Sequence, residues 1–334
     1  MSNAWDCKFA FYIKAMDDVP REFQDAHRRL VEACGRPAFA VFSPAIEVGR
    51  FLFSHWLPPR LILLFPDYLM VLSLETRSNQ VQTLDWSSEE LLGYGQAEFE
   101  ADCWFTLYPR ASSDQGVQIR FPSQAAGKFT ELGRLLRKWL EPQDETLTNL
   151  VQFPLPGLPK KLMNFLEAHD ECRPLSEFLF QPAMDHRGTQ RQRWPNLLML
   201  ATISGIVVLT DVNRGKPCEF GIEMTYLPIQ RVRLVDWMEP RDGRRASMRV
   251  CLKGKNGESV LSWPVYPGLK PYALRWSTVV NSMAAARATP KSHSETVLLH
   301  GEEDGADSAA PGSTDDHRRT SKAHRPLLTR PVTG

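Results

Sequence analysis

Hydrophobic residues are grouped into short runs along this chain, and the grouping occurs twice. Residues 60–65 and 68–75 are two apolar runs separated by a Pro-Asp turn, and residues 196–202 and 206–212 are two more. Runs of this length between turn residues predict paired strands that are buried on much of both faces. Further strands are predicted at 81–86, 90–100, 103–109 and 116–121, and at 219–228, 230–237, 247–254 and 259–264.

Each half of this pattern begins and ends with a predicted helix. Residues 20–33 have apolar residues at helical spacing and are followed by Gly35, which is placed to end the helix. Residues 159–169 have the same character in the second half. The segments 123–140 and 268–286 predict amphipathic helices that close the two halves.

An internal duplication accounts for the two halves. Five residues recur in the same order at a constant spacing of 138 positions. Such self-similarity predicts two copies of one structural unit. The recurring residues are Cys34, Phe42, Pro44, Ala45 and Trp56, followed by Cys172, Phe180, Pro182, Ala183 and Trp194.

The duplication divides the chain of 334 residues into four segments. Residues 1–141 form the first repeat, 142–156 a proline-containing linker, and 157–287 the second repeat. Residues 288–334 are rich in Ser, Thr, Gly, Pro and charged residues and contain almost no aromatic residues. This tail cannot bury enough apolar surface to offset the entropy of ordering, so we predict that it is disordered.

Composition places the chain among soluble globular proteins, with 43% hydrophobic and 24% charged residues. Its six cysteines have no disulfide framework or metal-ligand spacing, which predicts a reducing compartment. The N-terminus lacks a signal-peptide pattern, and no apolar run reaches the ~20 residues of a membrane-spanning helix. We therefore expect a cytoplasmic protein.

The formal net charge of +1 is unevenly divided. Residues 142–287 contain 19 Lys and Arg against 14 Asp and Glu, whereas residues 1–141 contain 15 against 18. The second repeat is therefore the basic half, although a modest excess of charge on a folded domain is usually solvated surface.

The order of predicted elements resembles the pleckstrin-homology-like superfamily, including its bacterial and GRAM-like members. The resemblance covers about residues 57–140 and 194–286. It rests on the hairpin LILLFPDYLMVLSLE, the stretch WSSEELLGYGQAEF, and the last strand with its helix, VQIRFPSQAAGKFTELGRLLRKWL. It implies a mainly β, α+β fold of two tandem pleckstrin-homology-like barrels, each with a preceding helix and a C-terminal capping helix. It also implies non-catalytic binding of a protein, a peptide or a lipid headgroup.

Members that bind phosphoinositides usually carry Lys and Arg in the loop after the first strand. The equivalent loops here are residues 65–67 and 202–205, and neither contains a basic residue. This departure favours another protein or a peptide as the partner. The alternative is a peripheral membrane adaptor that binds anionic lipid through the basic second repeat.

A group of arginines in the second repeat is the candidate ligand site. Guanidinium groups that converge from a strand and its adjoining loop can hold a phosphate or carboxylate through paired hydrogen bonds. The alternative is a solvated surface on which these arginines pair with Asp236, Glu239 and Asp242. The group consists of Arg231, Arg233, Arg241, Arg244, Arg245 and Arg249.

Three other features have plain structural interpretations beside functional ones. Residues 169–172 offer His and Cys as metal ligands, but a helix end is the better interpretation. Residues 186–193 are basic but lack interleaved aromatic residues, so a connecting loop is favoured over nucleic-acid binding. Trp56 and Trp194 are predicted core residues, and exposed faces would instead indicate a ligand groove.

The sequence contains no nucleophile elbow, phosphate loop, dinucleotide fingerprint or His–carboxylate pair. The Gly-Tyr-Gly at residues 93–95 lies within a strand pattern and predicts a bulge. We therefore predict a non-enzymatic intracellular binding or scaffolding protein with no cofactor and no metal site. An enzyme with a composite site between the repeats is the second alternative.

Overall fold

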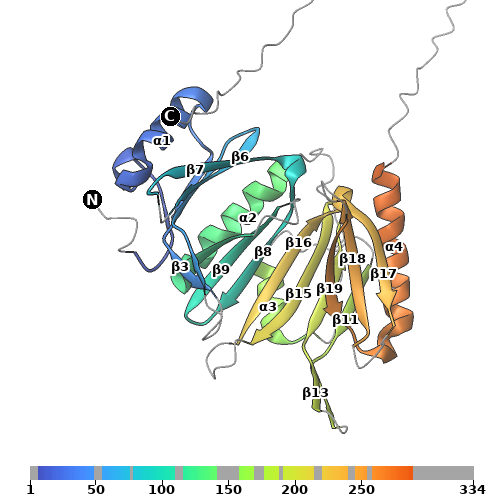
Figure 1. Ribbon diagram of the computed structural model, residues 1–334. Coiled ribbons are helices and arrows are strands. Elements are labelled where there is room, and N and C mark those ends of the chain that lie inside the picture. Colours follow the sequence, from blue (N-terminus) through green and yellow to red (C-terminus); the bar gives the residue numbers. More distant parts are fainter. Residues whose placement is uncertain are drawn as a thin grey trace, which may run out of the picture. The chain divides into compact units, whose positions relative to one another are not determined.

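The computed structural model has a mainly β, α+β fold with several antiparallel sheets, as the sequence predicts (Figure 1). The residues that it describes all belong to one compact unit. They are residues 7–48, 55–75, 78–109, 116–140, 158–168, 177–187, 191–213, 220–239, 245–253 and 258–288.

The first half of the described chain runs from an N-terminal strand to a long helix. Its helices are α1 (Arg21–Cys34) and α2 (Ala126–Leu140), and 3₁₀ turns lie at Met16–Asp18, Ser88–Glu90 and Ser123–Ala125. Its strands are β1 (Phe11–Tyr12), β2 (Phe39–Ser43), β3 (Ile46–Val48), β4 (His55–Leu57), β5 (Arg60–Leu64), β6 (Tyr68–Leu74), β7 (Val81–Ser87), β8 (Leu91–Phe99), β9 (Asp102–Pro109) and β10 (Val117–Pro122).

The second half has a similar series. Its helices are α3 (Lys160–Ala168) and α4 (Lys270–Ala288), and 3₁₀ turns lie at Ile229–Arg231 and Pro267–Leu269. Its strands are β11 (Glu177–Gln181), β12 (Met184–Arg187), β13 (Arg191–Trp194), β14 (Leu197–Ala201), β15 (Gly205–Asn213), β16 (Phe220–Pro228), β17 (Val232–Met238), β18 (Ser247–Lys253) and β19 (Glu258–Pro264).

From α1 onward, the first half has the same order of elements as the second half has from α3 onward. A 3₁₀ turn precedes both β8 and β17, and another precedes both α2 and α4. Each of β8 and β17 also has a register shift at its start, between Leu91 and Gly93 and between Val232 and Leu234. We call residues 7–140 the first repeat and residues 158–288 the second repeat.

The two repeats share a sheet, which the sequence analysis did not predict. The first repeat has a five-stranded sheet in the order β1-β2-β5-β6-β7, and the second repeat ends in the three-stranded sheet β17-β18-β19. Between them lies a seven-stranded sheet in the order β10-β9-β8-β16-β15-β14-β11. The last three strands of the first repeat, β8 to β10, thus form one sheet with strands β11, β14, β15 and β16 of the second repeat.

Glycine makes the close contact at this junction possible. β8 and β16 pair in antiparallel fashion from Phe99–Gly221 to Tyr94–Tyr226. A Cβ atom on Gly221 would lie 2.3 Å from the Glu98 carbonyl oxygen, and one on Gly93 would lie 2.2 Å from the Tyr226 carbonyl oxygen. Any side chain at either position would therefore collide with the backbone of the other repeat.

Three hydrophobic clusters fill the spaces between the layers. The first lies between α1 and the outer face of the five-stranded sheet and contains Phe23 and Phe42. The second lies between the five-stranded and seven-stranded sheets, and it includes residues of α2 and of α3. The third lies between the seven-stranded and three-stranded sheets and contains Trp276 of α4, which flanks β17 (Figure 1).

Several predictions about local structure are confirmed. The Pro66-Asp67 turn joins β5 to β6, and the N–H of Phe65 donates to the Tyr68 carbonyl over 2.8 Å. Gly35 follows α1 with φ of 81°, the left-handed region in which glycine is favoured. None of the described helices is long and apolar enough to cross a membrane.

Other predictions differ from the structure or lie outside it. Within the described residues the sheets are layered and open, and no closed barrel is seen. Trp194 is buried as predicted and packs edge-on against the Tyr266 ring, but Trp56, its counterpart on β4, is 67% exposed. The linker 142–156 and the predicted disordered tail from residue 289 on lie outside the described residues.

Candidate functional site

The predicted arginine site is divided among several partners in the structure. Arg233 and Arg249 lie on the solvent side of the three-stranded sheet, where each forms an ion pair. Arg249 binds Asp236 through both its Nε, at 2.9 Å, and a terminal nitrogen. The Asp236 carboxylate raises the pKa of Arg249. Arg233 pairs with Glu258, so both guanidinium groups are engaged by carboxylates of the chain itself.

Arg231 and Arg245 do not join them. Arg231 donates from Nη2 to the Ser88 carbonyl over 2.9 Å, which ties the 3₁₀ turns of the two repeats together. The Arg245 guanidinium lies 5.2 Å from the centre of the Trp194 ring. Arg241 and Arg244 lie outside the described residues, as do residues 169–172.

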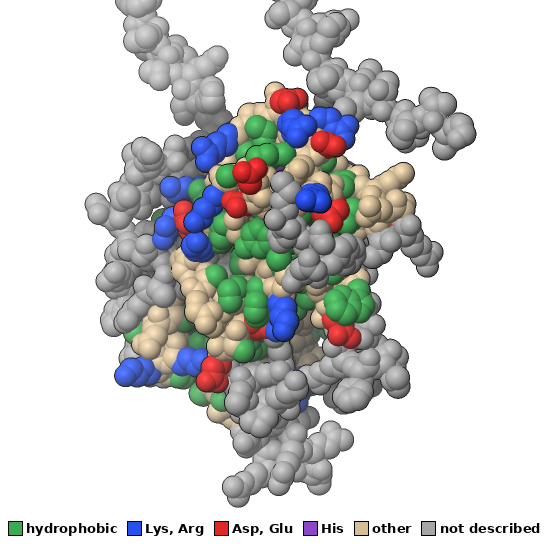
Figure 2. Space-filling view, turned by 90° about the vertical axis from the view of Figure 1, so that its left-hand side faces the viewer, with side chains coloured by type: hydrophobic (Ala, Val, Ile, Leu, Met, Phe, Trp, Pro, Cys, Tyr) green, Lys and Arg blue, Asp and Glu red, His purple; other side chains and the backbone are tan. Residues whose placement is uncertain are grey.

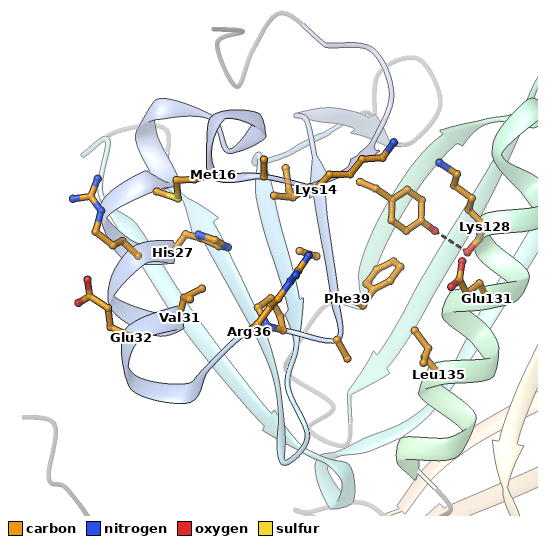
Figure 3. A pocket seen from close by; sticks show the side chains of 17 residues that line it. Lys14, Met16, His27, Val31, Glu32, Arg36, Phe39, Lys128, Glu131 and Leu135 are labelled. Atoms are coloured by element: carbon orange, nitrogen blue, oxygen red, sulfur yellow. Dashed lines mark hydrogen bonds between the residues drawn. The ribbon is translucent and has the colours of Figure 1, made fainter.

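The first repeat contains a large groove that the sequence analysis did not predict (Figure 3). Its volume is about 840 Å³, within the range of small-molecule sites. It lies where α1, the divergent ends of β1 and β2, and α2 meet. We call it the α1–α2 groove, and it is lined by residues 12–16, 27–28, 31–32 and 36–40 and by Lys128, Glu131 and Leu135.

Local structure forces β1 and β2 apart and so opens this groove. The two strands pair only at Phe11–Phe42 and Tyr12–Val41. Beyond Ile13, the Asp18 carboxylate accepts hydrogen bonds from the N–H groups of Lys14 and Ala15, at 2.9 and 3.0 Å, and turns the chain away. These bonds lower the pKa of Asp18, so the turn is held by a charged carboxylate.

Tyr12 fixes the wall of the groove next to α2. Its phenol donates a hydrogen bond of 2.7 Å to the Lys128 carbonyl, drawn in Figure 3, and its ring packs edge-on against Phe39 at 4.9 Å. The Lys128 ammonium lies 5.1 Å from the centre of the same ring. Burial, and then the nearby Glu131 carboxylate, raise the pKa of Tyr12, so it stays a neutral hydrogen-bond donor.

His27 is the most unusual group in the groove. It follows Phe23 by one helical turn on the inner face of α1, is only 8% exposed, and directs its ring into the groove (Figure 3). Burial lowers its pKa, which favours the neutral imidazole. Its Nδ1 is buried without a hydrogen-bond partner in the described structure. A buried polar atom left without a partner costs about 1–3 kcal/mol, so this nitrogen calls for a ligand or water.

Cationic groups surround an apolar interior in this groove. Lys14, Arg36 and Lys128 line it, and among the described residues none of them forms an ion pair. The ammonium groups of Lys14 and Lys128 extend toward each other in Figure 3. Glu32 and Glu131 are the acidic members of the lining. The apolar members shown in Figure 3 are Met16, Val31, Phe39 and Leu135.

This arrangement is suited to binding. The described lining contains no serine, threonine or cysteine that His27 could activate as a nucleophile. No group of three or more His, Cys, Asp or Glu that could hold a metal ion occurs in the described part of the chain. What the groove offers a ligand is an apolar body, a cationic rim and the ring of His27 in its wall.

Comparison with known proteins yields no relative: no protein-family model matches the chain, and neither does any curated protein.

Proposed function

We propose that this protein is a non-enzymatic binding protein made of two pleckstrin-homology-like repeats, and that the α1–α2 groove holds its ligand. The repeated order of six strands, a 3₁₀ turn, three strands and a closing helix supports the comparison with that superfamily. The matching register shifts in β8 and β17 support a common origin of the two repeats.

The groove of about 840 Å³, with the His27 ring in its wall and cationic side chains around it, carries the proposal. Lys14, Arg36 and Lys128 favour an anionic group at the rim, because positive charges without ion-pair partners stabilise a bound anion. Met16, Val31 and Leu135 favour an apolar body beneath it. The proposed ligand is thus a small organic anion, a carboxylate or phosphate monoester with an apolar chain.

Membrane binding through the second repeat is the weaker alternative. Arg233 and Arg249 are engaged in ion pairs, which reduces the positive charge that they offer to a lipid surface. The first repeat offers no broader basic surface on the face shown in Figure 2, where basic and acidic side chains are interspersed. Flotation with anionic vesicles at low salt tests this alternative directly.

Calorimetric titration with decanoate and with decyl phosphate tests the proposed ligand class. We expect both to bind the full chain, and neutral decanol to bind at least tenfold more weakly. The double variant Lys14→Gln with Lys128→Gln should lose at least tenfold in affinity for the anions, equivalent to about 1.4 kcal/mol. His27→Phe, which fills the groove and removes its nitrogen, should weaken all three.

Lys160 and Lys161 on α3 provide the matched control, because both are exposed lysines on the corresponding helix of the second repeat. Lys160→Gln with Lys161→Gln removes the same charge and should leave both affinities unchanged. If neither anion binds, or if both double variants weaken binding equally, the groove is not the site.

A further inference from the structure

β7 is an exposed edge strand of the first repeat. It pairs with β6 over its whole length, from Val81–Leu74 to Ser87–Tyr68, with no register shift. No described strand pairs with its other side. The successive residues 82–85 are all exposed, and Leu84 retains 45% of its accessible surface. Because neighbouring side chains point to opposite faces, both faces of the strand are open.

The hydrogen-bond pattern determines which backbone groups of β7 face outward. The N–H of Leu74 donates to the Pro59 carbonyl, so even-numbered residues of β6 face β5 and odd-numbered residues face β7. The register then places the outward-facing N–H and C=O groups of β7 at Thr83 and Asp85. The N–H of Ser87 agrees with this alternation, because it donates outward to the Glu90 carboxylate over 3.1 Å.

The corresponding strand of the second repeat is already paired at this edge. β16 holds the place of β7, directly before a 3₁₀ turn and the next strand. Its outer edge pairs with β8 over six residues. The strand at this place in the repeat can therefore pair with a further strand, as β16 does. Of the two corresponding strands, only β7 has no described strand on its outer side.

Several other described edges carry a partner or a residue that interrupts pairing. At β17, the side-chain amide of Asn281 accepts from the Val235 N–H at 2.8 Å and donates to its carbonyl at 2.9 Å, as a neighbouring strand would. At β19, Pro264 lacks an N–H group. At β10, the Arg120 carbonyl accepts from the N–H of Ala10 at 2.8 Å. α4 lies beside β11.

We propose that β7 pairs with β7 of a second copy of this chain, antiparallel and about a two-fold axis through Leu84. In this register Thr83 lies opposite the partner subunit's Asp85, and the outward N–H and C=O groups of both residues meet. Leu84 lies opposite the partner subunit's Leu84 at a non-hydrogen-bonded pair, where opposing side chains are closest. The two five-stranded sheets become one sheet of ten strands.

Self-complementarity favours a second copy over a different protein. The axis through Leu84 overlaps all of Val81–Ser87, places an apolar pair at its centre and opposes no like charges. An axis through Asp85 would bring two carboxylates face to face, which is destabilising. Asn281 covers the edge of β17, which prevents head-to-tail pairing of β7 with β17 of another copy, and the self-complementary register closes as a symmetric dimer.

Cysteine cross-linking tests the register. Exposed Cys34 is first replaced by serine, and single cysteines are then placed on β7 of the full chain. Under mild oxidation Leu84→Cys should form a covalent dimer, because position 84 lies directly opposite position 84 of the partner subunit. Gln82→Cys should not, since it lies opposite Trp86 of the partner subunit. A dimer formed through Thr83→Cys or Asp85→Cys alone would refute the Leu84 axis.

Sedimentation over a range of concentrations tests the dimer without cross-linking. We expect the mass to rise from that of the 38.0 kDa chain toward twice that value. Thr83→Pro deletes an outward-facing N–H and spares the bonds to β6, so it should abolish dimerisation at nearly unchanged melting temperature. When Thr83→Pro is combined with Leu84→Cys, the cross-linked dimer should no longer form. A wild-type chain that stays monomeric at all concentrations, or a dimer insensitive to Thr83→Pro, overturns the proposal.

Discussion

The helices that open the two repeats, α1 and α3, hold corresponding places but have different surroundings. α1 lies on the outside of the five-stranded sheet, and one edge of it borders the α1–α2 groove. α3 packs into the cluster between the repeats, where Leu162 and Phe165 are buried. Counted from the first residue of each helix, Leu166 corresponds to His27. The second repeat thus has a partly buried apolar side chain where the first has a buried imidazole.

This difference shows how a duplicated unit can divide its roles. When the second repeat joins the first through β16, the helix-bearing face of its first sheet becomes part of a shared core. In the first repeat the same face is covered by α1 and by the segment that precedes it, and a groove remains beside them. The repeat with the lower net charge, not the basic one, therefore contains the α1–α2 groove.

The strands β8 and β17 make a second comparison. β8 uses its outer edge to bind β16 of the other repeat. β17 has no such strand beside it, and Asn281 of α4 satisfies Val235 instead. The twelfth residue of α2, which corresponds to Asn281, is Arg137. Only the repeat that lacks a neighbouring strand has an amide at this position.

The largest loss of stability is expected from Gly221→Val, which changes the contact between β8 and β16. The new Cβ would lie 2.3 Å from the Glu98 carbonyl oxygen, so the backbones of β8 and β16 must separate. Overpacking of this kind costs about 2–4 kcal/mol, since backbone cannot turn aside as a side chain can. Thermal unfolding should show a melting temperature lower by roughly 5–15 °C.

Gly127→Val is the matched control for this change. Gly127 lies in α2, and a Cβ added there would meet no atom within 4 Å. Valine has a higher helix propensity than glycine, so the control should be neutral or slightly stabilising. Equal losses in the two variants would show that the junction does not depend on close backbone contact.

A smaller loss is expected from Asn281→Leu, which uncovers the edge of β17. Leucine leaves the N–H and C=O of Val235 without their side-chain partner, at a cost of about 2 kcal/mol in the free energy of unfolding. Asn281→Asp retains an acceptor for the N–H but places its second carboxylate oxygen against the Val235 carbonyl oxygen, and because two acceptors repel, partial rescue is not expected. Urea unfolding monitored by tryptophan fluorescence measures both losses.

Ser282→Ala, one residue further along α4, is the control for these variants. Its hydroxyl bonds only to the Thr278 carbonyl of its own helix, and its side chain is exposed. We expect a change within about 0.5 kcal/mol for this surface position. If Asn281→Leu is equally mild, the amide does not act as a substitute strand.

Local elements of this fold could be predicted from the sequence, but the partners of its strands could not. The apolar runs at β5 and β6, the Pro66-Asp67 turn and Gly35 each act over a few residues, so their patterns are visible locally. The pairing of β8 with β16 joins residues more than a hundred positions apart, and nothing in either strand specifies the other. The sequence features that accompany this pairing are Gly93 and Gly221, and Gly93 by itself predicted only a bulge.

The candidate site was missed for a related reason. Charge counts directed attention to Arg233 and Arg249, but charge in a sequence does not reveal whether a carboxylate lies across the strand. The groove depends on where β1 and β2 diverge, which is set by hydrogen bonds to Asp18. One signal was available: a histidine four residues after Phe23, on the apolar stripe of a predicted helix.

The smallest effect concerns His27, and it depends on pH. Burial lowers its pKa in the folded chain below the ordinary value of 6.5, so the unfolded chain binds more protons between these two pKa values. The stabilisation from neutral His27 is therefore complete above about pH 6.5 and is lost as pH falls toward the folded pKa. Unfolding by urea at about pH 7.5 and about pH 5.5 measures this loss.

His27→Leu gives the first repeat the residue that corresponds to Leu166, and so tests the comparison between α1 and α3. The variant should lose part of the wild-type pH dependence, because one group that titrates between the two conditions is gone. Near pH 7.5 it should be about 1 kcal/mol more stable, since an unpartnered buried nitrogen is replaced by apolar surface. Leucine should also weaken decanoate binding, as His27→Phe does. A variant that is more stable than the wild type and binds decanoate as tightly would show that His27 lowers the stability of the fold and takes no part in binding.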